Sequence, residues 1–186
     1  NPKFFSNGLD LDWGRGEGDG TGGDKAVFGK EFMGLMGRLI TFAVPTVCAV
    51  NGHGFGAGFM TALCHDVRIM RADRGYLCAN EIQIGIAIPD PELALFRHKM
   101  SASAFFDTVQ LAHRWTGPAA KTAGFVHEVA AEGALLAAAV DKARQLAPLG
   151  ANRELFAQSK ERIFGEGPSI NGGDGAAHLL RNMEAH

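Results

Sequence analysis

The chain has 186 residues, which is enough for one domain with a sizeable core. Its formal net charge of −2 argues against a general nucleic-acid binder, which carries a basic surface, and no apolar run reaches the roughly 20 residues of a membrane helix. Cys48, Cys64 and Cys78 have no CxxC spacing. They therefore predict reduced thiols in a core rather than a disulfide frame or a zinc site.

The first segment, FFSNGLD (residues 4–10), has two aromatic residues typical of a strand end and then a turn at Asn7 and Gly8. The turn presents the Leu9 backbone N–H as a candidate hydrogen-bond donor, and the alternative is an ordinary Asn-Gly hairpin. Because no strand precedes this turn, we expect N-terminal strands to be missing from the chain. Residues 14–25 are glycine-rich and charged, which predicts a loop that is either a lid or a surface loop without a role.

The next segment alternates between helix and strand. Apolar residues at helical spacing predict a helix over 26–43, ended by Pro45. Two short runs rich in β-branched residues, 46–50 and 67–70, predict buried strands on either side of a helix over 57–65. This order indicates a parallel sheet with crossover connections.

The glycine turn NGHGFGAGFM (residues 51–60) joins the first of these strands to the helix. Its glycines let the backbone approach a ligand, and the helix start directs free N–H groups, including that of Ala57, toward anything anionic. One alternative is a turn that only packs strand against helix. Another is a dinucleotide site, because residues 52–57 read GHGFGA and Asp73 lies near the end of the next strand.

A lone carboxylate, Glu81, lies in ANEIQIGI (residues 79–86), just after a predicted strand at 76–79. The surrounding isoleucines should remove water from the carboxyl, which raises its pKa and improves it as a base. The alternative is a strand-end glutamate that points to solvent.

From Pro91 onward the pattern is mostly helical, with one predicted late strand. The predicted helices cover 91–100, 101–114, 131–148 and 152–164, and the strand covers 125–129.

Taken in order, FFSNGLD, NGHGFGAG, NEIQIGI and WTGPAAKTAGFVHEV (115–129) resemble the enoyl-CoA hydratase/isomerase (crotonase) superfamily. The closest resemblance is to its Δ3,Δ2-enoyl-CoA isomerase branch, and it covers residues 4–130. It implies an α/β fold of the crotonase type, a spiral of βαβ units with a helical C-terminal region. We expect one domain, residues 1–186, with its core in 1–130 and the helical region in 131–186.

The resemblance also implies site residues. Leu9 and Ala57 would supply the two backbone amides of an oxyanion hole, and Glu81 would be the catalytic glutamate. Met60 stands where hydratases of the family carry the first of two glutamates. Since methionine cannot deprotonate water, we expect isomerisation of a 3-enoyl-CoA in fatty-acid β-oxidation by a single-glutamate proton shuttle. Phe59, Met60 and Ile86 are expected to line the acyl pocket and exclude water.

The expected partner is an acyl-CoA, with coenzyme A as part of the substrate and with no metal or other cofactor, no nucleic acid and no membrane. The resemblance implies a homotrimer or homohexamer. We expect a cytoplasmic location, with peroxisome and mitochondrion as alternatives. The cations Arg68, Arg71, Arg74, Arg97 and Lys99 are open candidates for the coenzyme A phosphates, and solvated surface charge explains each of them equally well.

Other functions stay open at this point. One is another crotonase-type enzyme, such as a hydratase or a hydrolase. A second alternative is a nicotinamide-binding module. A third is a non-catalytic family member that only oligomerises.

Overall fold

The computed structural model describes residues 3–14, 25–165 and 175–182. The loop predicted for 14–25 therefore lies, apart from its two end residues, outside the described residues. No helix within the described ranges combines the length and the apolar character needed to cross a bilayer.

The described strands form two parallel three-stranded sheets. The first contains, in spatial order, β1 (Phe4–Ser6), β3 (His53–Phe55) and β5 (Leu77–Cys78). The second contains β2 (Val47–Val50), β4 (Val67–Arg71) and β6 (Glu128–Ala130). The predicted parallel crossover between 46–50 and 67–70 is confirmed. The hairpin alternative for FFSNGLD is wrong, because β1 pairs in parallel with β3.

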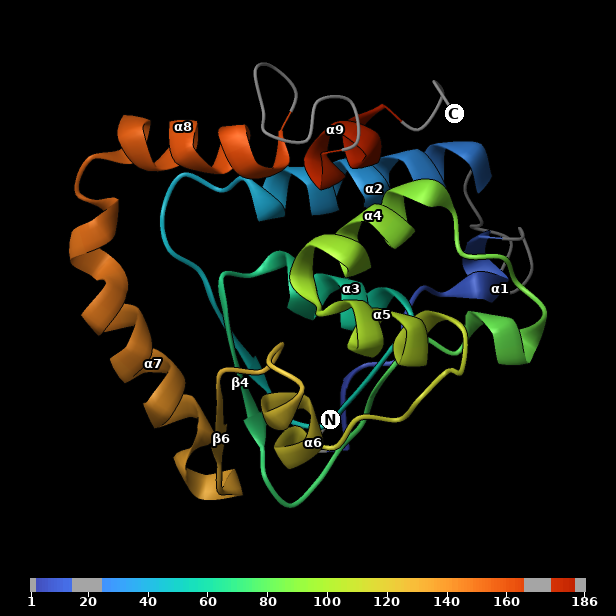
Figure 1. The fold of residues 1–186 in the computed structure, drawn as a ribbon, viewed down its shortest axis with the longest axis horizontal. Coiled ribbons are helices and arrows are strands. Elements are labelled where there is room, and N and C mark those ends of the chain that lie inside the picture. The colour runs from blue at the N-terminus through green and yellow to red at the C-terminus, as the bar shows by residue number, and fades with distance from the viewer. Residues whose placement is uncertain (1–2, 15–24, 166–174, 183–186) are drawn as a thin grey trace.

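Helical segments connect and cover these sheets (Figure 1). Before the last strand they are α1 (Leu11–Gly14), α2 (Lys25–Ile40), α3 (Ala57–Cys64), the 3-10 turn η1 (Glu81–Ile84), α4 (Asp90–Lys99), α5 (Ala102–Val109) and α6 (Gly117–Thr122). After it they are η2 (Glu132–Ala134), α7 (Leu135–Leu146), η3 (Ala147–Gly150), α8 (Arg153–Phe164) and α9 (Ala176–Arg181). The mostly helical character predicted from Pro91 onward is confirmed.

The core is built around α3, which packs against α2, α4, β1 and β3. The side chains of Phe59, Met60 and Leu63 on this helix are completely buried. Figure 1 shows α2, α8 and α9 lying together along one side of the molecule, while α7 covers β2 and β4. Helix α3 is thereby held between the sheet of β1 and β3 and the helices α2 and α4, and its first turn borders the site described below.

A buried polar cluster fastens the C-terminal end of α3. The guanidinium of Arg68 donates hydrogen bonds to the backbone carbonyls of Leu63, His65 and Phe125. Lys160 on α8 forms an ion pair with Asp66 at 2.8 Å. Arg68 is 4% exposed and its donors are used inside the protein, so this candidate for phosphate binding is a structural residue.

Arg71 is structural as well. It pairs with Asp73 at 2.5 Å and with Glu132 at 2.6 Å, and only 4% of its side chain is exposed.

The three cysteines are buried and free, as predicted. Burial raises the pKa of the Cys48 and Cys64 thiols to about 12. Because the thiolate is the reactive form, these two groups are inert at neutral pH and act as small apolar core residues.

Candidate active site

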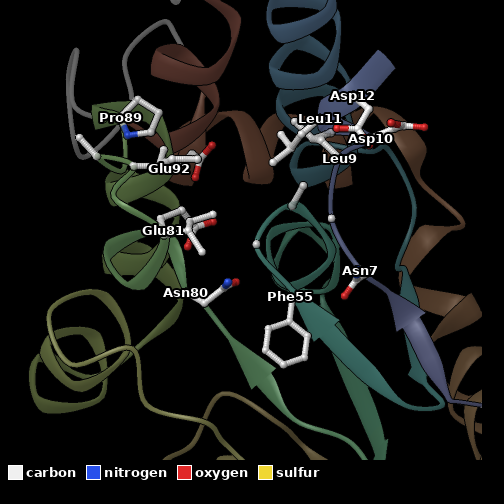
Figure 2. A pocket seen from close by; sticks show the side chains of 16 residues that line it. Asn7, Leu9, Asp10, Leu11, Asp12, Phe55, Asn80, Glu81, Pro89 and Glu92 are labelled. Atoms are coloured by element: carbon white, nitrogen blue, oxygen red, sulfur yellow. The ribbon is translucent and has the colours of Figure 1, made fainter. Parts of the chain in front are cut away.

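A cavity of about 680 Å³ opens where the three sequence segments meet (Figure 2). One wall is formed by Asn7 to Asp12 and the opposite wall by residues between Asn80 and Glu92, while Phe55, Gly56 and Ala57 lie between them. The fold thus brings Leu9, Ala57, Glu81 and Ile86, all predicted site residues, to the same cavity.

The turn after β1 lies directly beside the start of α3. A Cβ placed on Gly8 would be 3.2 Å from the Phe55 carbonyl oxygen and 3.7 Å from the Ala57 nitrogen. Gly8 has a φ of +93°, which turns the chain so that Leu9 faces the cavity from this side. Ala57 is the first residue of α3, and the first amides of a helix have no acceptor within it. Two backbone amides from distant parts of the chain therefore border one cavity.

The Glu81 carboxyl is turned toward the start of α3 rather than into solvent. A Cβ on Gly56 would be 3.0 Å from its Oε1 atom. Its Oε2 atom is buried and, within the described residues, has no hydrogen-bond partner. The solvent-facing alternative is therefore wrong. A buried carboxylate oxygen without a partner is costly, and such groups concentrate where a ligand or reaction uses them.

Burial raises the pKa of Glu81, as the sequence predicts, but the cause differs from the expected one. The isoleucines of the segment do not enclose the carboxyl, since Ile82, Ile84 and Ile86 are 48%, 54% and 45% exposed. The desolvation comes instead from the inward orientation of the side chain against Gly56. Ile84 and Ile86 contribute apolar surface to the same wall of the cavity.

The carboxyl of Glu92 also lines this wall, and the sequence pattern does not predict it as a site residue. It belongs to the first turn of α4, and Figure 2 shows it beside Glu81, across the cavity from Leu9 and Asp10. Burial, and then the charge of Glu81, raises the pKa of Glu92 to about 8. In the sequence Glu92 is indistinguishable from the acidic residues that are common in the first turn of any helix.

Two predicted pocket residues lie elsewhere. Contrary to the expectation that they line the pocket, Phe59 and Met60 have no exposed surface and are not among the residues that line this cavity. Phe59 packs instead against the rings of Phe96 and Phe125, at centroid distances of 5.4 and 5.7 Å. The reason is helix geometry: Ala57 faces the cavity, and the residues that follow on α3 turn into the core.

The dinucleotide alternative does not fit this arrangement. Strand β3 lies inside the supposed fingerprint and belongs to a different sheet from β2 and β4. Asp73, the supposed ribose ligand, pairs with Arg71 and does not line the cavity. In the described part of the chain, no three His, Cys, Asp or Glu side chains are grouped so as to hold a metal ion.

Comparison with known proteins agrees with the geometry. The family model described as enoyl-CoA hydratase/isomerase matches residues 1–163. The peroxisomal enoyl-CoA delta isomerase 2 of Arabidopsis thaliana is 34% identical over 171 residues, covering 89% of this chain and 71% of that protein. A carnitinyl-CoA dehydratase of Salmonella arizonae is also 34% identical over 171 residues. This match covers 89% of this chain and 63% of the dehydratase.

Among solved structures, a protein of Mycobacterium tuberculosis, described both as an enoyl-CoA isomerase and as a probable enoyl-CoA hydratase, matches with a TM-score of 0.80 and 26% identity. The match covers 100% of this chain and 76% of that one. The predicted crotonase-type fold is confirmed by this likeness and by the parallel strands of the two sheets.

Proposed function

The chain belongs to the enoyl-CoA hydratase/isomerase family, and we propose that it moves the double bond of a 3-enoyl-CoA to the 2-position. The observation that carries this proposal is the shared cavity, where the Leu9 and Ala57 amides meet the Glu81 carboxyl, whose Oε2 atom has no hydrogen-bond partner within the described residues. The 34% identity to a protein named an enoyl-CoA delta isomerase supports the same reaction.

In this proposal the thioester carbonyl oxygen lies between the N–H groups of Leu9 and Ala57. Loss of a proton from C2 converts the acyl group into a dienolate, whose negative charge develops on that oxygen. A preorganised amide donor of this kind typically stabilises the transition state by about 3 to 4 kcal/mol. The positive end of the α3 dipole acts in the same direction.

Glu81 is the base that removes the C2 proton. Its raised pKa brings the carboxyl closer to the pH of the reaction, which makes proton transfer to and from carbon more efficient. In the single-glutamate shuttle that the sequence predicts, the same carboxyl then returns a proton at C4. The reaction as proposed uses no metal and no redox cofactor, and coenzyme A enters as part of the substrate.

Replacing the base tests the proposal directly. Glu81→Gln keeps the size of the side chain but removes the base, so kcat/KM for a 3-enoyl-CoA should fall by about 100- to 10,000-fold. Acyl-CoA affinity, measured by calorimetry, should change little. Asp10→Asn, on the opposite wall, is the matched control, because asparagine preserves the cap that Asp10 provides to the Trp13 amide. Survival of full activity in Glu81→Gln would show that the assigned mechanism is wrong.

Hydration of a 2-enoyl-CoA is the second candidate function. The sequence disfavours it because Met60 replaces a glutamate, yet the cavity gains a second carboxyl from Glu92. The two functions separate when 3-enoyl-CoA and 2-enoyl-CoA are assayed side by side with the wild-type protein. Fast conversion of the 2-enoyl substrate to a 3-hydroxyacyl-CoA would replace the isomerase proposal by the hydratase one.

We further propose, from the family resemblance, a role in fatty-acid β-oxidation and assembly as a homotrimer or homohexamer. Apolar side chains on the outer faces of α7 and α8 support assembly, since Leu136 and Leu155 are 71% and 58% exposed. Light scattering on the purified protein tests it, and a monomeric mass would contradict it. A cytoplasmic location stays a prediction, to be compared with a peroxisomal one by imaging the tagged full-length protein.

A further inference from the structure

The single-glutamate shuttle leaves Glu92 without a role. Among the described residues, the cavity is lined by four acidic side chains, those of Asp10, Asp12, Glu81 and Glu92, and by no lysine, arginine or histidine. Asp10 and Asp12 lie on one wall, and Glu81 and Glu92 lie together on the other, each at the start of a helical segment. A second carboxyl within electrostatic reach of the base is costly unless one of the two keeps its proton.

The position of Glu92 is held firmly by its helix. The buried residues Ala94, Leu95 and Phe96 anchor α4, which packs against α3 and α9. Pro91 restricts the backbone at the start of α4, and the Glu92 amide donates to the Pro89 carbonyl at 3.0 Å. The carboxyl is therefore presented to the cavity from a rigid element, on the same side as Glu81 (Figure 2).

The two carboxyls are predisposed to different protonation states. Burial raises the pKa of both carboxyls, and at Glu92 the negative charge of Glu81 adds to this effect, which brings the pKa of Glu92 to about 8. At neutral pH Glu92 therefore keeps its proton beside the Glu81 carboxyl. Pairs of titratable groups whose environments separate their pKa values in this way typically divide the roles of base and acid.

The other charged groups around Glu92 do not reverse this order. Asp10 and Asp12 lie across the cavity and are acidic, so they bring no positive charge that would lower the pKa of Glu92. Helix α3 has no charged side chain. Helix α9 carries His178 and Arg181, and Arg181 pairs with Glu161 on α8 at 2.8 Å.

We infer that Glu92 is a second catalytic residue of this site, the acid that delivers the proton to C4 of the dienolate. This inference rests on the proposed function and changes only its second proton transfer. Glu81 takes the C2 proton and the C2–H electron pair enters the dienolate. The Glu92 O–H bond then breaks as a C4–H bond forms, which leaves Glu81 protonated and Glu92 ionised. Transfer of one proton from Glu81 to Glu92, directly or through water, restores the starting state.

An isotope experiment distinguishes the two forms of the mechanism. A 3-enoyl-CoA with two deuterium atoms at C2 is converted in ordinary water with enzyme in excess, so that each site turns over once. If Glu92 delivers the proton, the product carries only protium at C4, because the Glu92 proton comes from solvent. If Glu81 returns the proton it removed, deuterium appears at C4. Mass spectrometry of the product measures the difference, and deuterium transfer by the wild-type enzyme would overturn the inference.

The variant Glu92→Gln provides an independent readout. We expect kcat/KM to fall by about 100- to 10,000-fold, and the remaining product to carry deuterium at C4, because Glu81 must then return its own proton. The wild-type pH profile should lose activity as pH rises through about 8, and this alkaline limb should be absent from the residual activity of the variant. Wild-type kcat/KM in Glu92→Gln would refute the role of Glu92.

Controls keep the outcomes separate. Asp90→Asn removes a carboxyl from the same first turn of α4 but outside the cavity lining, and it should retain both the wild-type rate and the wild-type isotope pattern. Unchanged thermal unfolding and acyl-CoA binding show that Glu92→Gln is folded. If the wild-type protein does not isomerise 3-enoyl-CoA at all, the proposed function itself is wrong. If it isomerises with transfer of deuterium from C2 to C4, the proposed function stands and only the inference about Glu92 fails.

Discussion

At the scale of single residues, Gly56 links backbone conformation to the chemistry of the site. Its φ of +49° disfavours any side chain, and a Cβ there would be 3.0 Å from the Glu81 Oε1 atom. The residue thus fixes both the start of α3 and the room available to the base. The sequence indicates a special role for this glycine-rich turn, but the contact with Glu81 depends on two segments that lie 25 positions apart.

Gly56→Ala should therefore lower kcat strongly while it lowers the free energy of unfolding only modestly. We expect a loss of about 1 kcal/mol in the free energy of unfolding from the positive φ, together with a fall in kcat of at least tenfold as the carboxyl moves. Gly124→Ala is the matched control, because Gly124 also has a positive φ but nothing lies within 4 Å of its Cβ position. Urea unfolding and steady-state kinetics on both variants check this, and equal kcat values for the two would contradict it.

Glu92 shows what residue-level reading of a sequence misses. An acidic residue in the first turn of a helix has an ordinary explanation in the helix dipole, so nothing in the local pattern marks it. Its significance comes from the neighbouring carboxyl of Glu81, which changes its protonation. Phe59 and Met60 show the opposite error, because their closeness to Ala57 in sequence does not place them on the same face of α3.

At the scale of elements, the helices and buried strands follow from periodicity, whereas β3 does not. Strand β3 has three residues, one of them glycine, and no alternating pattern. It forms because β1 and β5 flank it in parallel, and both partners come from distant parts of the chain. By contrast, β2 and β4 are apolar runs that predict strands on their own.

The attachment of α8 to the core depends on the ion pair between Lys160 and Asp66. Lys160→Met leaves Asp66 without its cation at a largely buried site, so we expect a loss of about 1 to 3 kcal/mol in the free energy of unfolding. The site lies elsewhere, so kcat should be unchanged. Arg144→Met breaks the exposed pair between Arg144 and Asp141 and should cost less than about 0.5 kcal/mol. Denaturant titration measures the free energy of unfolding of both variants. Similar losses in the two would refute the claim that the buried pair stabilises the fold more than the exposed one.

At the scale of the whole molecule, the cavity joins the N-terminal segment to residues 80–92 through the turn before α3. A ligand that bridges these walls binds only the folded chain, so it must stabilise the fold by mass action. An acyl-CoA at 100 times its Kd should add about 2.7 kcal/mol to the free energy of unfolding. Nicotinamide dinucleotides should add nothing, because Asp73 is paired with Arg71 outside the cavity. Thermal shift assays decide between the two ligands, and stabilisation by NADH alone would restore the dinucleotide alternative.

The sequence by itself determined the main helices and the buried strands, the parallel connections, and the three segments that carry Leu9, Ala57 and Glu81. These features depend on apolar spacing, glycine placement and motif order, which can be seen in the sequence without knowledge of the fold. The tertiary structure alone decided that β3 forms, that Phe59 and Met60 belong to the core, and that Glu92 joins Glu81. Each of these depends on which distant segments the crossovers bring together and on which way a side chain turns. Burial and neighbouring charge then set the chemistry of the carboxyls, and neither exists until the chain has folded.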